Sequence, residues 1–186
     1  EEFLLAVGTI EPRKNLNFLV TAFEQFTRAR PDSKLKLVIA GGRGWLTNPF
    51  FENIQKSAAR DRIVITDYLH DAELRALYSS CRAFVYPSLY EGFGLPPLEA
   101  MACGAPVIAS RIPALVEIAS EAASFFEPTE VADLLEAILA LLEDANARKK
   151  FSLAGQARAA EFSWQKAAHR TLEVYKFALR EFSARR

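Results

Sequence analysis

The sequence is poor in the residues that mark redox, metal and nucleic-acid chemistry. Its 186 residues include two cysteines and two histidines. Neither His70 nor His169 stands at metal-ligand spacing from a Cys, Asp or Glu, so we expect no metal site. Cys81 and Cys103 lie in apolar runs, which favours buried, reduced thiols in a cytoplasmic protein. The 23 basic and 23 acidic residues cancel, which argues against a nucleic-acid partner bound through broad positive charge.

Longer signals are missing as well. No apolar run approaches the roughly 18 residues that span a membrane, and no signal peptide is recognisable. Neither G-x-G-x-x-G after the first apolar run nor G-x-x-x-x-G-K-[ST] occurs, which argues against a dinucleotide-dependent dehydrogenase and a P-loop enzyme. The chain opens with Glu1 and passes at once into a strand-like run. We therefore interpret residues 1–186 as a single domain excised from a longer protein.

The sequence does contain an alternation of short apolar runs and amphipathic segments. Apolar residues recur at helical spacing from Leu16 to Phe26, from Leu74 to Tyr78 and from Leu134 to Leu142. The apolar runs are continuous, as in strands covered on both faces, and span residues 3–7, 35–40, 63–66, 83–86, 107–109 and 123–126. This order predicts an α/β fold with a doubly wound parallel sheet of about six strands, whose ligand crevice lies at the carboxyl ends of the strands.

The end of the chain is predicted to be a helical tail. Residues 146–186 contain no strand candidate. One helix is expected around Phe151 and Ala154, and Ser163 is expected to cap a second helix that carries Leu172. Trp164 is assigned to the core rather than to a ligand platform.

The most informative stretch is EGFGLPPLEAMACGAPVIAS at 91–110. It places two carboxylates, Glu91 and Glu99, on either side of a glycine turn and a proline pair. A glycine turn that leads into a helix leaves backbone N–H groups free to face an anion. The stretch therefore suits a ligand with phosphates in its middle and hydroxyl groups at both ends, such as a sugar nucleotide.

This stretch resembles the Glu-x7-Glu signature of retaining glycosyltransferases of the GT-B architecture. The family is the large "group 1" family (family 4), which includes bacterial mannosyl-, glucosyl- and galactosyltransferases. The similarity extends through VGTIEPRKN at 7–15, IAGGRGW at 39–45, TDYLHD at 66–71, VYPSLYE at 85–91 and SRIP at 110–113. It implies that the chain is one half of a GT-B fold, the Rossmann-like domain that binds the nucleotide-sugar donor. The N-terminal acceptor domain is then absent, and peripheral membrane association through that domain stays open.

Two adjacent cations, Arg13 and Lys14, follow the first predicted strand. An arginine can bind phosphate oxygens with two hydrogen bonds, and a lysine acts as a point charge. The alternative is an exposed basic pair at a helix start, where cations are unfavourable and a bound anion would remove the misfit. By resemblance, the pair neutralises the diphosphate leaving group, and Thr9 stands where the family often has a further arginine.

Glycines end the first two predicted strands. Gly8, Gly41 and Gly42 either let the backbone approach the ligand or supply turn geometry with positive φ, and both roles stay open. A second group of residues is implied by the resemblance alone to provide backbone contacts to the sugar and the diphosphate: Gly92, Phe93, Gly94 and Leu95.

The turn after the third predicted strand lines the nucleobase site in the resembled enzymes. That implies that Tyr68 and Leu69 contact the base, largely through their backbone. Asp67 stands where the family commonly has glycine. Its carboxylate either accepts the N–H groups of a guanine edge, which favours GDP-mannose as the donor, or it helps to cap the following helix.

The two glutamates have separate roles by resemblance. Glu99 binds the ribose hydroxyls, and Glu91 contacts the donor sugar near the reacting carbon. The alternatives are that Glu99 merely favours a helix N-terminus and that Glu91 is a surface turn residue. The sequence leaves open whether Glu91 is a nucleophile or stabilises an oxocarbenium-like state.

The resemblance implies a full-length enzyme that transfers a hexose from a nucleoside diphosphate sugar to an acceptor hydroxyl with retention, without a metal or other cofactor. Its catalytic residues are then Glu91, Arg13 and Lys14, and the domain alone is expected to bind the donor without transferring sugar. Two alternatives remain. One is an epimerase or phosphorylase of the same architecture, and the other is a non-catalytic module that binds nucleotide sugars.

Overall fold

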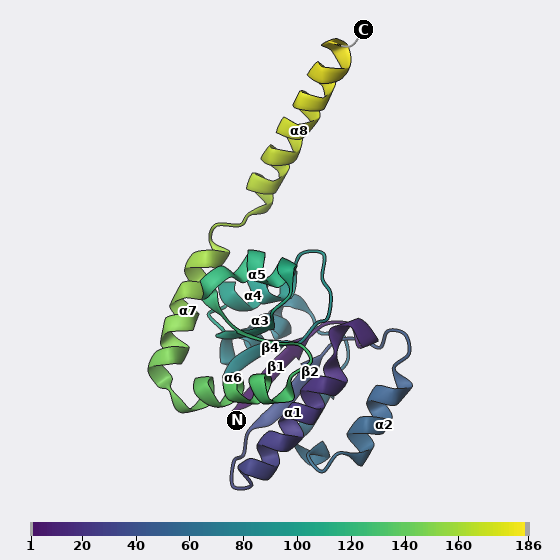
Figure 1. Cartoon of the computed structure of the whole chain (residues 1–186), viewed down its shortest axis with the longest axis vertical. Helices are drawn as coiled ribbons and strands as arrows, with labels where there is room; N and C mark the ends of the chain where they lie inside the picture. Colours follow the sequence, from purple (N-terminus) through teal and green to yellow (C-terminus); the bar gives the residue numbers. More distant parts are fainter. Residues whose placement is uncertain (1, 185–186) are drawn as a thin grey trace.

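Six parallel strands form one sheet at the centre of the computed structural model, which describes residues 2–184 (Figure 1). Their order across the sheet is β3-β2-β1-β4-β5-β6. The strands are β1 (Phe3–Val7), β2 (Lys36–Ala40), β3 (Ile63–Thr66), β4 (Ala83–Tyr86), β5 (Val107–Ser110) and β6 (Ala123–Phe126). The doubly wound parallel sheet predicted from the sequence is confirmed. Only two ends differ, because β2 begins and β5 ends one residue later than expected.

Strand β1 shows why the apolar runs are continuous. Leu5 pairs with Val38 of β2 on one side and with Phe84 of β4 on the other. Leu4 and Ala6 belong to the core cluster on one face of the sheet, whereas Leu5 belongs to the cluster on the other face. Successive side chains of a strand point to opposite faces, so a strand covered on both faces needs apolar residues at every position.

Helices cover both faces of the sheet. One layer contains α1 (Leu16–Ala29), α2 (Asn48–Lys56) and α6 (Val131–Glu143), and the other contains α3 (Asp71–Ser80), α4 (Leu95–Ala102) and α5 (Pro113–Ala119). Three 3-10 turns join them: η1 (Pro12–Lys14), η2 (Arg60–Arg62) and η3 (Ser120–Ala122). The amphipathic segments assigned to α1, α3 and α6 are confirmed. Helix α2 was not predicted, because Phe50 and Ile54 are its buried residues and two positions make a weak periodic signal.

The tail consists of α7 (Ala145–Ala159), which packs on the domain, and α8 (Trp164–Ala184), which projects away from it (Figure 1). The hydroxyl of Ser163 accepts a hydrogen bond from the backbone N–H of Lys166 over 3.2 Å, which confirms the predicted cap. The assignment of Trp164 to the core is wrong, because α8 leaves the domain at this point and Trp164 is 77% exposed. The last two residues of the predicted tail lie outside the described part. None of the helices between residues 2 and 184 has the apolar length that a membrane crossing requires.

Candidate functional site

The candidate site lies where the strand order reverses, at the carboxyl ends of β1 and β4. In open α/β sheets a crevice forms at this point, because the connections of the two strands leave in opposite directions. The chain leaves β1 through Gly8 toward η1, and it leaves β4 through Pro87 and Ser88. The backbone N–H of Leu89 donates to the carbonyl oxygen of Arg13 over 2.9 Å. The two loops are therefore fixed to each other.

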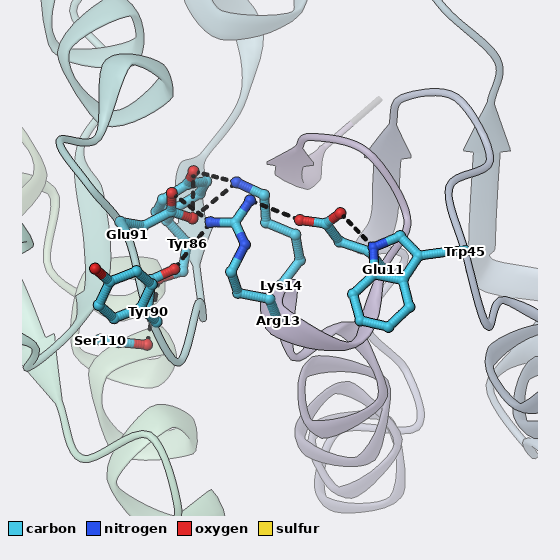
Figure 2. A network of polar contacts seen from close by, with 8 residues as sticks. All are labelled: Glu11, Arg13, Lys14, Trp45, Tyr86, Tyr90, Glu91 and Ser110. Carbon is cyan, nitrogen blue, oxygen red and sulfur yellow. Dashed lines mark hydrogen bonds and ion pairs between the residues drawn. The ribbon is translucent and has the colours of Figure 1, made fainter.

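A cluster of charged side chains joins these loops (Figure 2). Nη1 of Arg13 lies 2.7 Å from Oε2 of Glu91, and Nζ of Lys14 lies 2.8 Å from Oε1 of the same carboxylate. The hydroxyl of Tyr86 accepts a hydrogen bond from Lys14 over 2.6 Å and donates one to Glu91 over 2.9 Å. The structure thus brings together all three residues that were predicted to be catalytic.

Burial strengthens these contacts. Lys14 is 8% exposed, and a buried cation is stable only when it is paired and hydrogen-bonded. Burial alone would raise the pKa of Glu91, but the hydrogen bonds that it accepts, first among them that of Lys14, and the charge of Lys14 together hold that pKa below its ordinary value. Burial, followed by the nearby charge of Glu91, raises the pKa of Tyr86. Glu91 is therefore ionised at neutral pH, while Tyr86 keeps its proton and can donate it.

The cluster continues on the far side of Arg13 (Figure 2). Nη2 of Arg13 lies 2.6 Å from Oε1 of Glu11, and Oε2 of Glu11 accepts a hydrogen bond from Nε1 of Trp45 over 3.1 Å. Arg13 is therefore held between two carboxylates. Trp45 lies on the loop after β2, so this chain of contacts links a third loop to the site.

The alternative of an exposed basic pair at the start of a helix does not describe Arg13 and Lys14. Arg13 and Lys14 end the 3-10 turn η1, and α1 begins only after Asn15, which has a left-handed conformation with φ 54°. The two cations are also not free. Both are paired with Glu91, so their charge is balanced within the protein.

Two of the three glycines after β1 and β2 have a structural cause. Gly8 and Gly41 have φ values of +145° and +152°, and a Cβ atom on Gly41 would lie 2.2 Å from the carbonyl oxygen of Gly8. Gly42 has no positive φ, and nothing lies within 4 Å of the position of its Cβ. Turn geometry thus explains Gly8 and Gly41. Gly42 is left as a position where the backbone is open to a ligand.

The glycine loop before α4 offers fewer backbone donors than the sequence suggested. The helix begins at Leu95, and the next two residues, Pro96 and Pro97, have no N–H. Gly94 has a φ of +114°, whereas Gly92 has no positive φ and nothing within 4 Å of its Cβ position. A bound anion would therefore meet the N–H groups before the prolines, rather than a complete helix N-terminus. Phe93 packs edge-on against Phe162, with ring centroids 6.1 Å apart.

Glu99 stands apart from the charged cluster. It lies on α4, and its Oε2 accepts a hydrogen bond from the hydroxyl of Tyr78 on α3 over 3.1 Å. Burial and the charge of Glu99 raise the pKa of Tyr78, which keeps this phenol a donor. The Glu99 residue itself is exposed. The two glutamates therefore have different surroundings. Glu91 forms ion pairs with two cations, and Glu99 accepts a hydrogen bond from a phenol.

The residues assigned to the nucleobase lie after β3, on the other side of β2 from the charged cluster. Tyr68 is 76% exposed and packs edge-on against His70. His70, and not Asp67, is the N-cap residue of α3, and its backbone N–H donates to Oε2 of Glu73 over 3.0 Å. The alternative in which Asp67 caps this helix is therefore wrong. Leu69 packs partly against the core. Nowhere between residues 2 and 184 do three His, Cys, Asp or Glu side chains gather as metal ligands do.

Sequence reasoning missed three participants. Tyr86 was assigned only to a strand, although a phenol at the last position of a parallel strand reaches the crevice. Glu11 stands two residues before Arg13 and could have been recognised as its partner. Trp45 carried no local signal, because its contact with Glu11 joins loops that are 34 residues apart.

Comparison with known proteins agrees with this geometry. A match to the family described as "Glycosyl transferases group 1" covers residues 1–158. The chain is 36% identical over 174 residues to the O-antigen chain mannosyltransferase B of Escherichia coli. It is 33% identical over 186 residues to the MMP alpha-(1->4)-mannosyltransferase of Mycolicibacterium hassiacum. The alignments cover 94% and 97% of this chain but 45% and 44% of the relatives, so the chain spans less than half of their length.

The fold has a counterpart among solved structures. The sucrose-phosphate synthase of Thermosynechococcus elongatus matches with a TM-score of 0.85 and 28% identity, over 97% of this chain and 46% of that enzyme. The match supports the Rossmann-like fold of the GT-B type that was expected from the sequence. Here too, the similarity is confined to one part of a longer protein.

Proposed function

The chain belongs to the glycosyl transferases group 1 family, and we propose that it forms the donor-binding half of a hexosyltransferase. The complete enzyme would move a hexose from a nucleoside diphosphate sugar to an acceptor hydroxyl with retention at the reacting carbon. An acceptor-binding domain outside residues 1–186 would supply the other wall of the cleft. The reaction would run in the cytoplasm without a metal.

The observation that carries this proposal is the position of Arg13 and Lys14. Both cations lie at the switch point of the sheet, where nucleotides bind in folds of this kind. Departure of a nucleoside diphosphate leaves negative charge on phosphate oxygens, and preorganised cations stabilise that charge in the transition state. Arg13 is held from both sides by carboxylates and Lys14 by Tyr86 and Glu91.

The other parts of the donor are assigned around this pair. Glu99 takes the ribose hydroxyls, and Glu91 acts on the sugar near the reacting carbon. The base lies by Tyr68 and Leu69. The remaining contacts to the sugar and the diphosphate are assigned to the glycines after β1 and β2 and to the loop before α4 with the first residue of that helix. These residues are Gly8, Gly42, Gly92, Phe93, Gly94 and Leu95. The open backbone at Gly42 and Gly92 supports this part of the assignment.

Mannose is the favoured sugar, and GDP-mannose is the favoured donor. Two of the relatives named above are mannosyltransferases by name. The exposed carboxylate of Asp67 is available to the N–H groups of a guanine edge, because among the described residues it is bound to no other group. A uracil presents a different edge with a single ring N–H, so this contact would separate the two bases.

A calorimetric screen of the 186-residue chain against GDP-mannose, UDP-glucose and ADP-glucose tests the proposal. We expect binding of the nucleotide sugars with GDP-mannose the tightest, and no sugar transfer by this chain alone. Replacement of Asp67 by Asn should reduce the preference for GDP over UDP. Absence of binding by all three nucleotide sugars would refute the donor site, and tighter binding of UDP-glucose would refute the choice of base.

A further inference from the structure

We propose that Glu91 occupies the place of the donor diphosphate while the site has no ligand, and that the diphosphate binds by exchange with Glu91 on Arg13 and Lys14. The inference rests on the proposed function, because it takes these two cations as the phosphate-binding groups. It adds that Glu91 lowers the affinity of the free protein for the diphosphate. In the free protein this carboxylate competes with the ligand.

The geometry of Glu91 is that of a bound anion. Each of its two oxygens meets one cation, Oε2 at 2.7 Å from Arg13 and Oε1 at 2.8 Å from Lys14. A phosphate group binds to a pair of cations in the same way, with different oxygens on each. The carboxylate and a phosphate cannot both fill this position.

The charges lead to the same conclusion. Arg13 and Lys14 carry two positive charges, and Glu11 and Glu91 carry two negative charges, so the cluster is neutral as it stands. A diphosphate added beside Glu91 would find no net attraction and would meet a carboxylate of like charge at short range. Exchange removes this repulsion, because Arg13 and Lys14 then face phosphate oxygens instead of Glu91.

The backbone beside Glu91 permits such a movement. Glu91 lies in the loop between β4 and α4, outside any helix or strand. Its neighbour Gly92 has no positive φ, and nothing lies within 4 Å of its Cβ position. Once it leaves the two cations, the carboxylate could meet the donor sugar that the proposed function assigns to Glu91. Diphosphate binding would thereby release Glu91 to the sugar only when a donor is present.

The proposal reverses the usual effect of removing a contact in a binding site. Replacement of Glu91 by Gln keeps the shape of the side chain and removes its charge. Arg13 and Lys14 then lose a competitor, so a diphosphate should bind more tightly. If Glu91 served only to hold the cations in place, the same change would weaken binding.

Calorimetric titration with inorganic pyrophosphate and with GDP decides between these outcomes. We expect Glu91→Gln to bind pyrophosphate about tenfold more tightly than the unchanged chain, on the scale of one hydrogen bond between charged groups. Glu91→Asp, whose shorter carboxylate cannot reach both cations equally well, should lie between the two. The matched control is Glu143→Gln, which removes one carboxylate from an ion pair with Arg30, the residue after α1, away from the candidate site. It should bind pyrophosphate like the unchanged chain.

Equal or weaker binding of pyrophosphate by Glu91→Gln overturns the proposal, while binding of GDP by all forms leaves the donor site intact. If Glu91→Gln does not fold, as judged by circular dichroism, the comparison of Glu91→Asp with the unchanged chain decides in the same way. If no form binds pyrophosphate or GDP, the donor site itself is refuted and this inference with it. A tenfold gain shared by Glu143→Gln would reflect net charge alone and would also overturn the exchange.

Discussion

Nζ of Lys14 lies 2.8 Å from Oε1 of Glu91, although the two residues are 77 positions apart in the sequence. Their side chains are 11% and 9% exposed. Glu91 compensates the charge of Lys14, and Lys14 together with Arg13 compensates the charge of Glu91. The contact joins the loop after β1 to the loop after β4 across the switch point of the sheet. It therefore contributes both to the fold and to the proposed phosphate site.

Replacement of Lys14 by Met should separate these two contributions. The variant keeps an apolar stem and loses the charge. We expect the affinity for GDP to fall by about 1.5–3 kcal/mol, the scale of a hydrogen bond to a charged group, while guanosine binds almost as before. Calorimetry with both ligands measures the difference. Equal losses for guanosine and GDP would show that Lys14 does not act on the phosphates.

The same variant should also be less stable, because Glu91 is left partly buried with only one of its two cations, Arg13. We expect the free energy of unfolding in urea to fall by about 1–3 kcal/mol. The double variant Lys14→Met/Glu91→Gln should recover most of that stability but not the affinity for GDP. This comparison is a double-mutant cycle, which measures the coupling between two residues in contact.

The stability of the protein should depend on the protonation of Glu91 at low pH. Its pKa is lowered in the folded state from the ordinary value of 4.5, so the unfolded chain takes up the proton first as the pH falls. The stabilisation from this group is complete above pH 4.5 and is lost as the pH falls through the folded-state pKa. Urea unfolding at several pH values should show a steeper loss for the unchanged chain than for Glu91→Gln. The same slope in both would mean that other carboxylates cause the acid loss.

The fold could be predicted from the sequence because its signals are local. Continuous apolar runs mark strands covered on both faces. Ser163 marks the start of α8, because its hydroxyl accepts a hydrogen bond from Lys166, only three residues further along the chain. Whether a side chain is buried depends on residues that are distant in the sequence, so it leaves no such local signal. Trp164 was assigned to the core by its residue type, yet it begins a helix that projects from the domain and is exposed.

Three members of the charged cluster were singled out from the sequence, but their pairing was not. Arg13, Lys14 and Glu91 stood out by type and position at the ends of predicted strands. The sequence suggested cations waiting for an anion, because nothing within a few residues revealed that Glu91 would reach them. Contacts of Lys14 with Tyr86 and Glu91 join segments 72 and 77 residues apart. They follow only from the strand order that places β1 beside β4.

The link from Arg13 through Glu11 to Trp45 should make the tryptophan a reporter of phosphate binding. The sequence has two tryptophans, and replacement of Trp164 by Phe leaves Trp45 alone. We expect the fluorescence of this variant to change on titration with GDP, because Arg13 alters its contact with Glu11 when it binds phosphate. The matched variant Trp45→Phe retains Trp164 on α8 and should show almost no change. A larger response from Trp45→Phe would contradict the link.

Gly41 and Gly42 are neighbours in sequence and should respond in opposite ways to the same change. Gly41→Ala forces a Cβ into a backbone with φ +152° and to within 2.2 Å of the carbonyl oxygen of Gly8. A collision with backbone cannot be relieved by a rotamer change, so we expect a loss of about 3–5 kcal/mol in the free energy of unfolding, in the range of severe backbone and packing defects.

Gly42→Ala meets neither obstacle, since its φ is not positive and its Cβ position is open. Its stability should stay within about 0.5 kcal/mol of the unchanged chain, as for surface substitutions away from special features. Its affinity for GDP should nevertheless fall several-fold if the ligand approaches the backbone here, because the new methyl group would occupy that space. Urea unfolding and calorimetry on the two variants separate a glycine required by the backbone from one required by the ligand. Unchanged GDP affinity in Gly42→Ala would remove Gly42 from the site, and a stability loss equal to that of Gly41→Ala would show that the structural cause is shared.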